Sequence, residues 1–304
     1  MNHNQEIQDQ QDYHPFKSQK TKEVYLTYYD KKAKKWPVDS ETQYVKTSFG
    51  QTFVRISGSK NSPPLVLLPG DTVNSLDWIP LIEVLSKNYR TYALDQIFDN
   101  GRSIYTRRIE KPEDFMQWLD DFFTELDLDH INLMGYSYGG WLASLFALFY
   151  PERLIKLILL CPVSALRPRI MLLIRTILQY VIHTHYMAKK YVYWMYTDAV
   201  KKNEECKKYV DEMITEELLA RKCFKKRKFV NPTVLTDKDW QTIKVPTLFL
   251  IGENEVIYSA EKVIRYLKDL NPNIQTAIVS GAGHDLPIVK PEWVINEVLK
   301  FLKK

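Results

Sequence analysis

The sequence of 304 residues has only three cysteines, only ten glycines and no long apolar run. Cys161, Cys206 and Cys223 are odd in number and far apart, so neither a disulfide framework nor a Cys-x-x-Cys metal site is expected. Residues 1–11 are polar and lack the apolar stretch of a secretory signal. These absences favour a reducing compartment, and we expect the protein in the cytoplasm.

Neither a membrane-spanning helix nor a strongly basic balance is present. The most apolar segment, residues 170–182, is interrupted by Arg175, Thr176 and Gln179. It is shorter than the roughly 20 residues that a spanning helix needs, so no membrane span is predicted. The formal net charge is only +5, whereas nucleic-acid-binding domains carry a larger basic excess on one face. No nucleic-acid partner is therefore expected.

The residues that are present suffice for a sizeable core. Hydrophobic residues make up 45% of the chain and aromatic residues 13%. A chain of this length forms one large domain or two small ones. The composition therefore indicates a packed globular protein rather than a disordered or fibrous one.

Short apolar runs alternate with helical stretches along most of the chain. Residues 43–56 predict a β-hairpin that turns near Gly50. Residues 64–68, Pro-Leu-Val-Leu-Leu, are continuously apolar, as in a strand buried on both faces of a parallel sheet. Further strands are expected at residues 90–95, 131–135, 154–160, 246–251 and 276–279, and helices at 78–85, 112–126, 141–149, 260–270 and 291–302. This alternation predicts an α/β fold with a mostly parallel, doubly wound sheet.

Residues 163–240 break the alternation, because they show helical periodicity and many aromatic residues but no strand pattern. We interpret them as a helical cap inserted over the carboxyl edge of the sheet. The core then comprises residues 21–162 and 241–304, preceded by a flexible segment at residues 1–20. The insertion contains 16 Lys or Arg and nine Asp or Glu, a net charge of about +7.

Part of this charge lies in a basic run at residues 221–228. Such a run is usually a solvated surface, although it can also bind anionic lipid or nucleic acid. We therefore expect at most a weak surface association with membranes through the basic cap.

His183 and His185 lie close together in the cap. Side chains at positions i and i+2 of a helix diverge, and no third ligand is near in the sequence. The sequence therefore predicts no metal site.

The pattern that carries chemistry is Gly-x-Ser-x-Gly at residues 135–139, between a predicted strand and a predicted helix. A sharp strand-to-helix turn strains the backbone of such a serine, and small residues two positions before and after avoid collision. Ser137 is then expected to project from the turn. The Tyr138 N–H, first in the helix, has no intrahelical partner and can donate to an oxyanion. In isolation, the same residues also fit a helix-capping serine in a glycine-rich turn.

An acid and a histidine follow in the order that hydrolases with this turn present. Glu255 lies on the loop after the next-to-last predicted strand, and His284 lies on a glycine-rich loop after the last one. One ring nitrogen of the histidine can reach Ser137 while the other donates to the acid. Ser137, Glu255 and His284 therefore form the predicted triad, with Glu253 as the alternative acid.

A fourth motif, Leu-Leu-Pro-Gly-Asp at residues 67–71, offers the Asp71 backbone N–H as a second oxyanion donor. Together these motifs resemble the α/β-hydrolase superfamily, in particular its carboxylesterase-like members with a helical cap, from about Thr47 to the C-terminus. Residues 93–103 resemble the Asp and Gly-x-Gly-x-Ser loop of that family. Residues 150–153, Tyr-Pro-Glu-Arg, resemble its Pro-Glu-Arg signature.

The resemblance implies a serine hydrolase that catalyses acyl transfer. His284 would take the Ser137 proton, Ser137 would attack an ester carbonyl, and the Tyr138 and Asp71 N–H groups would hold the oxyanion. Water would then hydrolyse the acyl-enzyme. The implied substrate is a small-molecule carboxylic ester of small or medium chain length, and no cofactor is implied, neither a metal nor an organic group.

The chain departs from the family pattern at three positions. Pro69 stands where a histidine usually precedes Gly70, which keeps the backbone donor but removes a side chain that commonly braces the loop. Glu255 replaces the commoner aspartate. Asp99 or Asn100 replaces the middle glycine of the Gly-x-Gly-x-Ser loop.

Two other functions stay open from the sequence, because this fold hosts many of them. One is a C–C bond hydrolase or another acyl hydrolase that uses the same triad. The other is a ligand-binding or signalling protein that turns over slowly. The oligomeric state stays open as well.

Overall fold

The computed structural model describes residues 13–163, 165–182 and 184–304. Its strands are β1 Glu41–Thr47, β2 Gly50–Ser57, β3 Pro64–Leu68, β4 Arg90–Leu94, β5 Ile104–Tyr105, β6 Ile131–Tyr136, β7 Leu154–Leu160, β8 Thr247–Gly252 and β9 Ile274–Val279. Within this part of the chain they form a nine-stranded sheet in the order β1-β2-β4-β3-β6-β7-β8-β9, with β5 beside β2. β1, β2 and β4 pair antiparallel, and every later neighbour from β4 to β9 is parallel.

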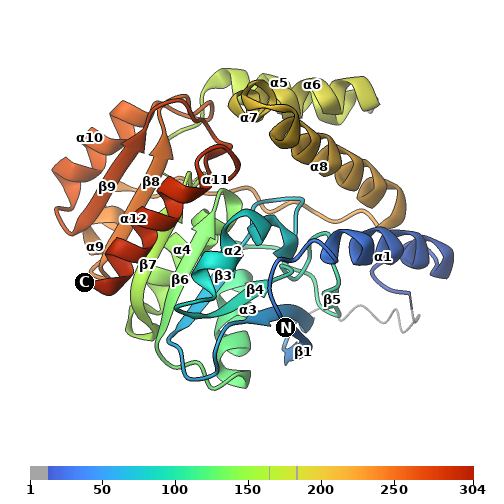
Figure 1. Ribbon diagram of the computed structural model, residues 1–304, viewed down its shortest axis with the longest axis horizontal. Coiled ribbons are helices and arrows are strands. Elements are labelled where there is room, and N and C mark those ends of the chain that lie inside the picture. The colour runs from blue at the N-terminus through green and yellow to red at the C-terminus, as the bar shows by residue number, and fades with distance from the viewer. Residues whose placement is uncertain (1–12, 164, 183) are drawn as a thin grey trace, which may run out of the picture.

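Helices cover both faces of this sheet (Figure 1). Their bounds are α1 Gln19–Ala33, α2 Ile79–Leu85, α3 Pro112–Glu125, α4 Tyr138–Phe149, α5 Ile170–Val181, α6 His185–Met195, α7 Thr197–Lys202, α8 Glu204–Cys223, α9 Asp237–Thr242, α10 Ala260–Leu270, α11 Leu286–Val289 and α12 Pro291–Lys303, with 3-10 turns η1 Ser75–Trp78 and η2 Pro151–Arg153. α2 packs against α12, whereas α3 packs against α4, which contacts β6 and β7. Every residue of β6 and β8 is buried, as expected for central parallel strands. The predicted α/β fold is confirmed.

The predicted cap interval, residues 163–240, contains helices α5 to α8, which lie above one edge of the sheet in Figure 1. After α8 the chain returns toward the core through residues 224–236, which form no helix or strand. The interval ends inside α9, which packs against α10 of the core. Trp240 of α9 is fully buried there, so the last residues of the interval lie with the core.

The predicted flexible segment, residues 1–20, differs from the structure where it can be compared. Residues 1–12 lie outside the described residues. From Tyr13 onward the chain is packed: Phe16 is buried, and its ring centre lies 4.3 Å from that of Phe224. Helix α1 then begins at Gln19, capped by the Ser18 side chain. Burial of aromatic rings therefore orders a stretch whose polar composition predicted flexibility.

α1 is joined to the cap by a buried ion pair. Lys32 Nζ lies 2.5 Å from Glu216 Oε2 on α8, and both side chains are almost fully buried. The other carboxylate oxygen of Glu216 accepts a hydrogen bond from Asn74 Nδ2 at 2.6 Å. Three distant segments therefore meet at one carboxylate. In the described part of the chain, no helix is long and apolar enough to cross a membrane.

We predict that Lys32→Met destabilises the fold by about 3–5 kcal/mol, because it leaves the Glu216 carboxylate buried without its cation. Lys31→Met is the matched control, since Lys31 is the preceding residue and is exposed. Urea unfolding of both variants measures the difference. Equal midpoints for the two variants would contradict a structural role for the pair.

Candidate active site

Ser137 lies at the junction of β6 and α4 in a strained backbone conformation. Its φ is 53° and its ψ is −113°, a region that residues with a side chain rarely adopt. The Ser137 N–H donates to Leu160 O at 2.9 Å, and the Ser137 carbonyl accepts from Trp141 N and Val163 N at 3.2 Å. Hydrogen bonds to β7 and α4 therefore hold Ser137 in this strained conformation.

The two glycines of the motif allow this turn because the backbone passes very close to them. A Cβ built on Gly135 would lie 2.2 Å from Gly139 O. A Cβ built on Gly139 would lie 2.2 Å from Leu68 O at the end of β3. Neither position has room for a side chain, so both glycines are required by packing as well as by conformation.

The structure brings the three predicted triad residues together. His284 Nε2 lies 2.9 Å from Ser137 Oγ, and His284 Nδ1 lies 2.9 Å from Glu255 Oε2. Because the carboxylate only accepts, Nδ1 carries the ring proton and Nε2 is free to accept from the serine hydroxyl. Glu255 and His284 are almost completely buried. This is the arrangement in which a histidine removes a proton from a serine.

Both loops are held by further hydrogen bonds. The second oxygen of Glu255 accepts from Ile257 N at 2.9 Å. The Tyr136 hydroxyl donates to the His284 carbonyl at 2.7 Å. Asp285, fully buried, accepts from Ala199 N of α7 at 2.6 Å, so the cap is tied to the histidine loop.

The environment of His284 raises its pKa above the ordinary 6.5. Burial by itself lowers the pKa of this ring, because it disfavours the charged form. The nearby Glu255 carboxylate, with smaller contributions from Asp285 and Asp77, outweighs burial. The Glu255 carboxylate therefore stabilises the charged form of the His284 ring.

The loop after β3 lies directly against the nucleophile. A Cβ built on Gly70 would lie 3.7 Å from the Ser137 Cβ. Asp71 is the next residue on this loop, and Tyr138 is the first residue of α4, whose N–H has no intrahelical acceptor. The two predicted oxyanion donors thus belong to segments that meet at Ser137.

Sequence reasoning missed the side chains that brace this loop in place of the usual histidine. Gln96, buried after β4, donates to Pro69 O at 2.6 Å and to Gly70 O at 3.1 Å. The Asp77 carboxylate accepts from the Gly70 N–H, and burial raises the pKa of Asp77 to about 6. No sequence signal marks Gln96 or Asp77, because neither is adjacent to a motif.

Arg227 is a third residue that the sequence did not single out. It belongs to the basic run at residues 221–228, yet its guanidinium Nη2 lies 2.6 Å from Asp99 Oδ1 and 3.1 Å from Asp71 Oδ1. It also donates to the Phe98 carbonyl. Burial raises the pKa of Asp99 to about 7, although Arg227 opposes the rise. Lys226 and Lys228 on either side are exposed, so Arg227 turns inward between two lysines that face solvent.

Two weaker candidates lie apart from this chemistry. Glu253, the alternative acid, is exposed and accepts from Ser280 Oγ at 2.6 Å. His183 lies outside the described residues, and His185 is exposed at the start of α6. Among the described residues, the one cluster with metal-ligand spacing is Cys161, Glu255 and His284. Two of its members are already hydrogen bonded to each other, so the cluster belongs to the triad.

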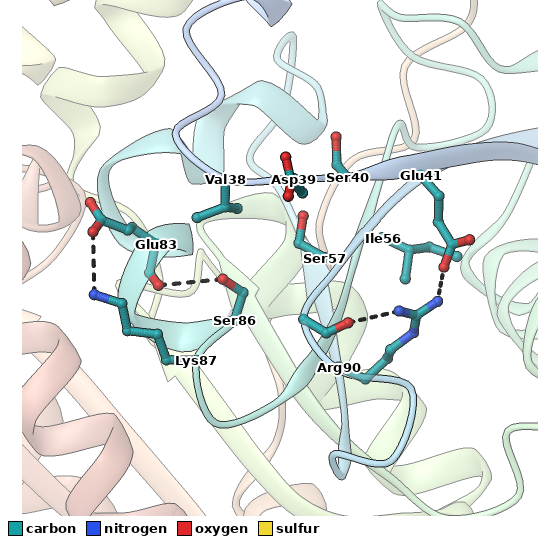
Figure 2. A pocket seen from close by; sticks show the side chains of 11 residues that line it. Val38, Asp39, Ser40, Glu41, Ile56, Ser57, Glu83, Ser86, Lys87 and Arg90 are labelled. Atoms are coloured by element: carbon teal, nitrogen blue, oxygen red, sulfur yellow. Dashed lines mark hydrogen bonds and ion pairs between the residues drawn. The ribbon is translucent and has the colours of Figure 1, made fainter.

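A surface pocket of about 450 Å³ lies elsewhere, between the start of β1, the end of β2 and the end of α2 (Figure 2). Four of its charged side chains form two ion pairs, as Lys87 lies 3.2 Å from Glu83 and Arg90 contacts Glu41. The Arg90 guanidinium also donates to Gly58 O at 2.7 Å. Its lining includes no His and no Cys.

A strained serine between strand and helix, a histidine and an acid on later loops of a mostly parallel sheet define a serine hydrolase of the α/β type. The α/β hydrolase fold family model matches residues 63–291, and the chain belongs to this family.

Its relatives in Bacillus subtilis are carboxylesterases. Carboxylesterase YbfK is 33% identical over 279 residues, 90% of this chain and 92% of that protein. Its crystal structure has a TM-score of 0.83, with 93% of this chain and 98% of that chain covered. The crystal structure of naproxen esterase has a TM-score of 0.84 at 29% identity, with 93% and 98% covered. The predicted class, a carboxylesterase-type serine hydrolase, is thereby confirmed.

The pKa of His284 generates a prediction for pH dependence. Only the neutral imidazole accepts a proton, so kcat/KM should fall as the pH drops through the raised pKa, with a midpoint above 6.5. Glu255→Gln removes the charge that raises this pKa. We expect the midpoint to move downward and kcat to fall by roughly 10²–10⁴-fold.

Glu253→Gln serves as the control, because it makes the same chemical change two residues away on an exposed side chain. Its pH profile should match that of the unmodified protein. An acid limb that moves equally in both variants would rule out the assigned partnership of Glu255 and His284.

Proposed function

We propose that this chain hydrolyses small or medium-chain carboxylic esters with Ser137 as nucleophile, His284 as base and Glu255 as the residue that orients the base. The observation that carries the proposal is the continuous hydrogen-bonded path from Ser137 Oγ through both ring nitrogens of His284 to Glu255. A supporting observation is the similarity to carboxylesterases over nine-tenths of the chain.

The proposed reaction has two stages. In the first, His284 Nε2 takes the proton of Ser137 as the oxygen attacks the ester carbonyl, and the imidazolium then protonates the departing alcohol. In the second, His284 takes a proton from water, which attacks the acyl group on Ser137 and releases the acid. Backbone N–H groups of Asp71 and Tyr138 stabilise the negative oxygen in both stages.

The cap supports the proposed preference for small or medium acyl chains. The Tyr196 ring, between α6 and α7, has its centre 6.4 Å from that of His284. Its hydroxyl lies 3.5 Å from that of Tyr136. The Tyr196 ring therefore lies close to the triad histidine, where it would obstruct a long acyl chain.

A panel of p-nitrophenyl esters of increasing acyl length, with a β-diketone beside it, tests the reaction. We expect turnover of the esters that declines for long chains, no cleavage of the diketone, and a loss of about 10⁴-fold or more in Ser137→Ala. Preferred cleavage of the diketone would identify a C–C bond hydrolase. Binding of the esters with a single turnover would identify a ligand-binding protein.

Arg227 supplies a prediction for the oxyanion loop. Because its guanidinium holds Asp71 and Asp99, Arg227→Met should loosen the loop and lower kcat by about tenfold while KM changes little. Lys228→Met is the matched control, one residue along and exposed. Both are assayed below their unfolding temperatures. Equal kcat values in the two variants would show that Arg227 does not position the loop.

A further inference from the structure

Helix α5 of the cap turns its apolar side away from the protein. Ile170 is 73% exposed and Ile177 is 60% exposed. The side chains that share this exposure, and that form what we call the α5 face, are Ile170, Met171, Leu173, Ile174, Ile177 and Leu178. With 3.6 residues per turn they occupy one continuous side of the helix.

The polar side chains of α5 point the other way, toward the protein. Gln179 is buried and donates to Glu217 Oε1 of α8 at 3.2 Å. The Arg175 guanidinium lies 4.7 Å from the centre of the Trp194 ring of α6. Thr176 is partly buried beside them. A helix on the surface of a protein in water normally turns its polar side outward and its apolar side toward the core. The exposed side of α5 therefore suits contact with an apolar phase rather than with water.

The apolar surface continues beyond α5 into the turn and the start of α6. Ile182 is 42% exposed and Tyr186 is 69% exposed. Tyrosine is enriched at the depth of lipid headgroups, because its ring is apolar and its hydroxyl is polar. The α5 face therefore carries an aromatic anchor at its edge.

The charged residues within the segment that carries this surface are all of one sign. Residues 163–197 contain five Lys or Arg and no Asp or Glu. Arg167 and Arg169, just before α5, and Lys190 on α6 are exposed. An in-plane helix with an apolar face and basic neighbours is the arrangement that binds anionic lipid headgroups.

We propose that the α5 face, with Ile182 and Tyr186, binds the surface of an anionic lipid bilayer, with the helix lying in the plane of the interface. The apolar side chains enter the boundary between headgroups and acyl chains, and the basic side chains contact lipid phosphates. The basic run at residues 221–228, the other candidate for binding anionic lipid, is not part of this surface. It begins at the C-terminal end of α8, whereas α7 precedes the N-terminal end of that helix.

The charge pattern favours lipid over a second copy of the chain. A symmetric dimer through the α5 face would place the same patch of each copy against itself. Basic residues would then meet basic residues with no acidic partner in residues 163–197, and like charges in an interface are repulsive. Anionic headgroups complement the same charges.

The proposed surface is linked to the triad through Arg169. Its backbone N–H donates to Ile257 O at 2.7 Å, and its guanidinium donates to Glu255 O at 3.2 Å. The start of α5 is therefore fastened to the loop that carries the triad acid. A bilayer bound at the α5 face would therefore lie on the same side of the molecule as the triad. Esters dissolved in the lipid would then be close to the active site.

Flotation of the full chain with vesicles tests the proposal. We expect binding to vesicles of phosphatidylcholine mixed with phosphatidylglycerol, and weaker binding to phosphatidylcholine alone. The double variant Leu173→Gln and Ile177→Gln should weaken binding by about tenfold or more, since two exposed apolar side chains that would enter the bilayer become polar. Arg167→Glu with Lys190→Glu should abolish the preference for phosphatidylglycerol.

The matched control is Val24→Gln with Phe149→Gln, which replaces two exposed apolar residues on other helices, 46% and 49% exposed. It should bind vesicles like the unmodified protein. The three double variants of surface residues should all hydrolyse a water-soluble ester normally. Ser137→Ala should bind vesicles equally well, so failure of the triad and failure of the membrane proposal give different results.

Two outcomes would overturn the proposal. One is a dimer, measured by light scattering, that the Leu173 and Ile177 variant makes monomeric while no form binds vesicles; a second copy would then cover the α5 face. The other is a monomer that binds neither kind of vesicle.

Discussion

The backbone of Ser137 is the constraint around which the molecule is arranged. A residue with a side chain keeps φ at 53° only where its surroundings hold it there. Here β7 accepts its N–H and α4 begins immediately after it. Gly135 lets the first turn of α4 lie against β6, and Gly139 lets the backbone at the end of β3 approach to contact distance. The buried parallel strands supply the rigidity that this turn requires.

The other candidate site residues approach Ser137 from loops at the ends of neighbouring strands. The loops after β3, β8 and β9 bring the proposed oxyanion segment, Glu255 and His284 to one edge of the sheet. The cap also takes part, since Arg227 bonds to Asp71 and Ala199 bonds to Asp285. Hydrogen bonds therefore join the predicted cap interval to the core, and the loop that lacks the usual histidine is braced from both.

Much of this could be predicted from the sequence, and the failures have physical causes. The strand at residues 64–68 is continuously apolar and bounded by turns, and the order of serine, acid and histidine constrains the site strongly. α1 was missed because its buried stripe is two tyrosines and a lysine on an otherwise polar helix. Arg227 was hidden within a basic run because sequence does not reveal which charge turns inward. For α5, periodicity defines two faces but not which one meets the protein.

The central claim is that Ser137 is activated by His284 for attack on a carbonyl. The most direct measurement is reaction of the folded protein with a fluorophosphonate, followed by mapping of the adduct by mass spectrometry. We predict one adduct per chain, on Ser137. The adduct should be absent in Ser137→Ala and should form more slowly in Glu255→Ala. A folded protein that stays unlabelled, or that is labelled elsewhere, would contradict it.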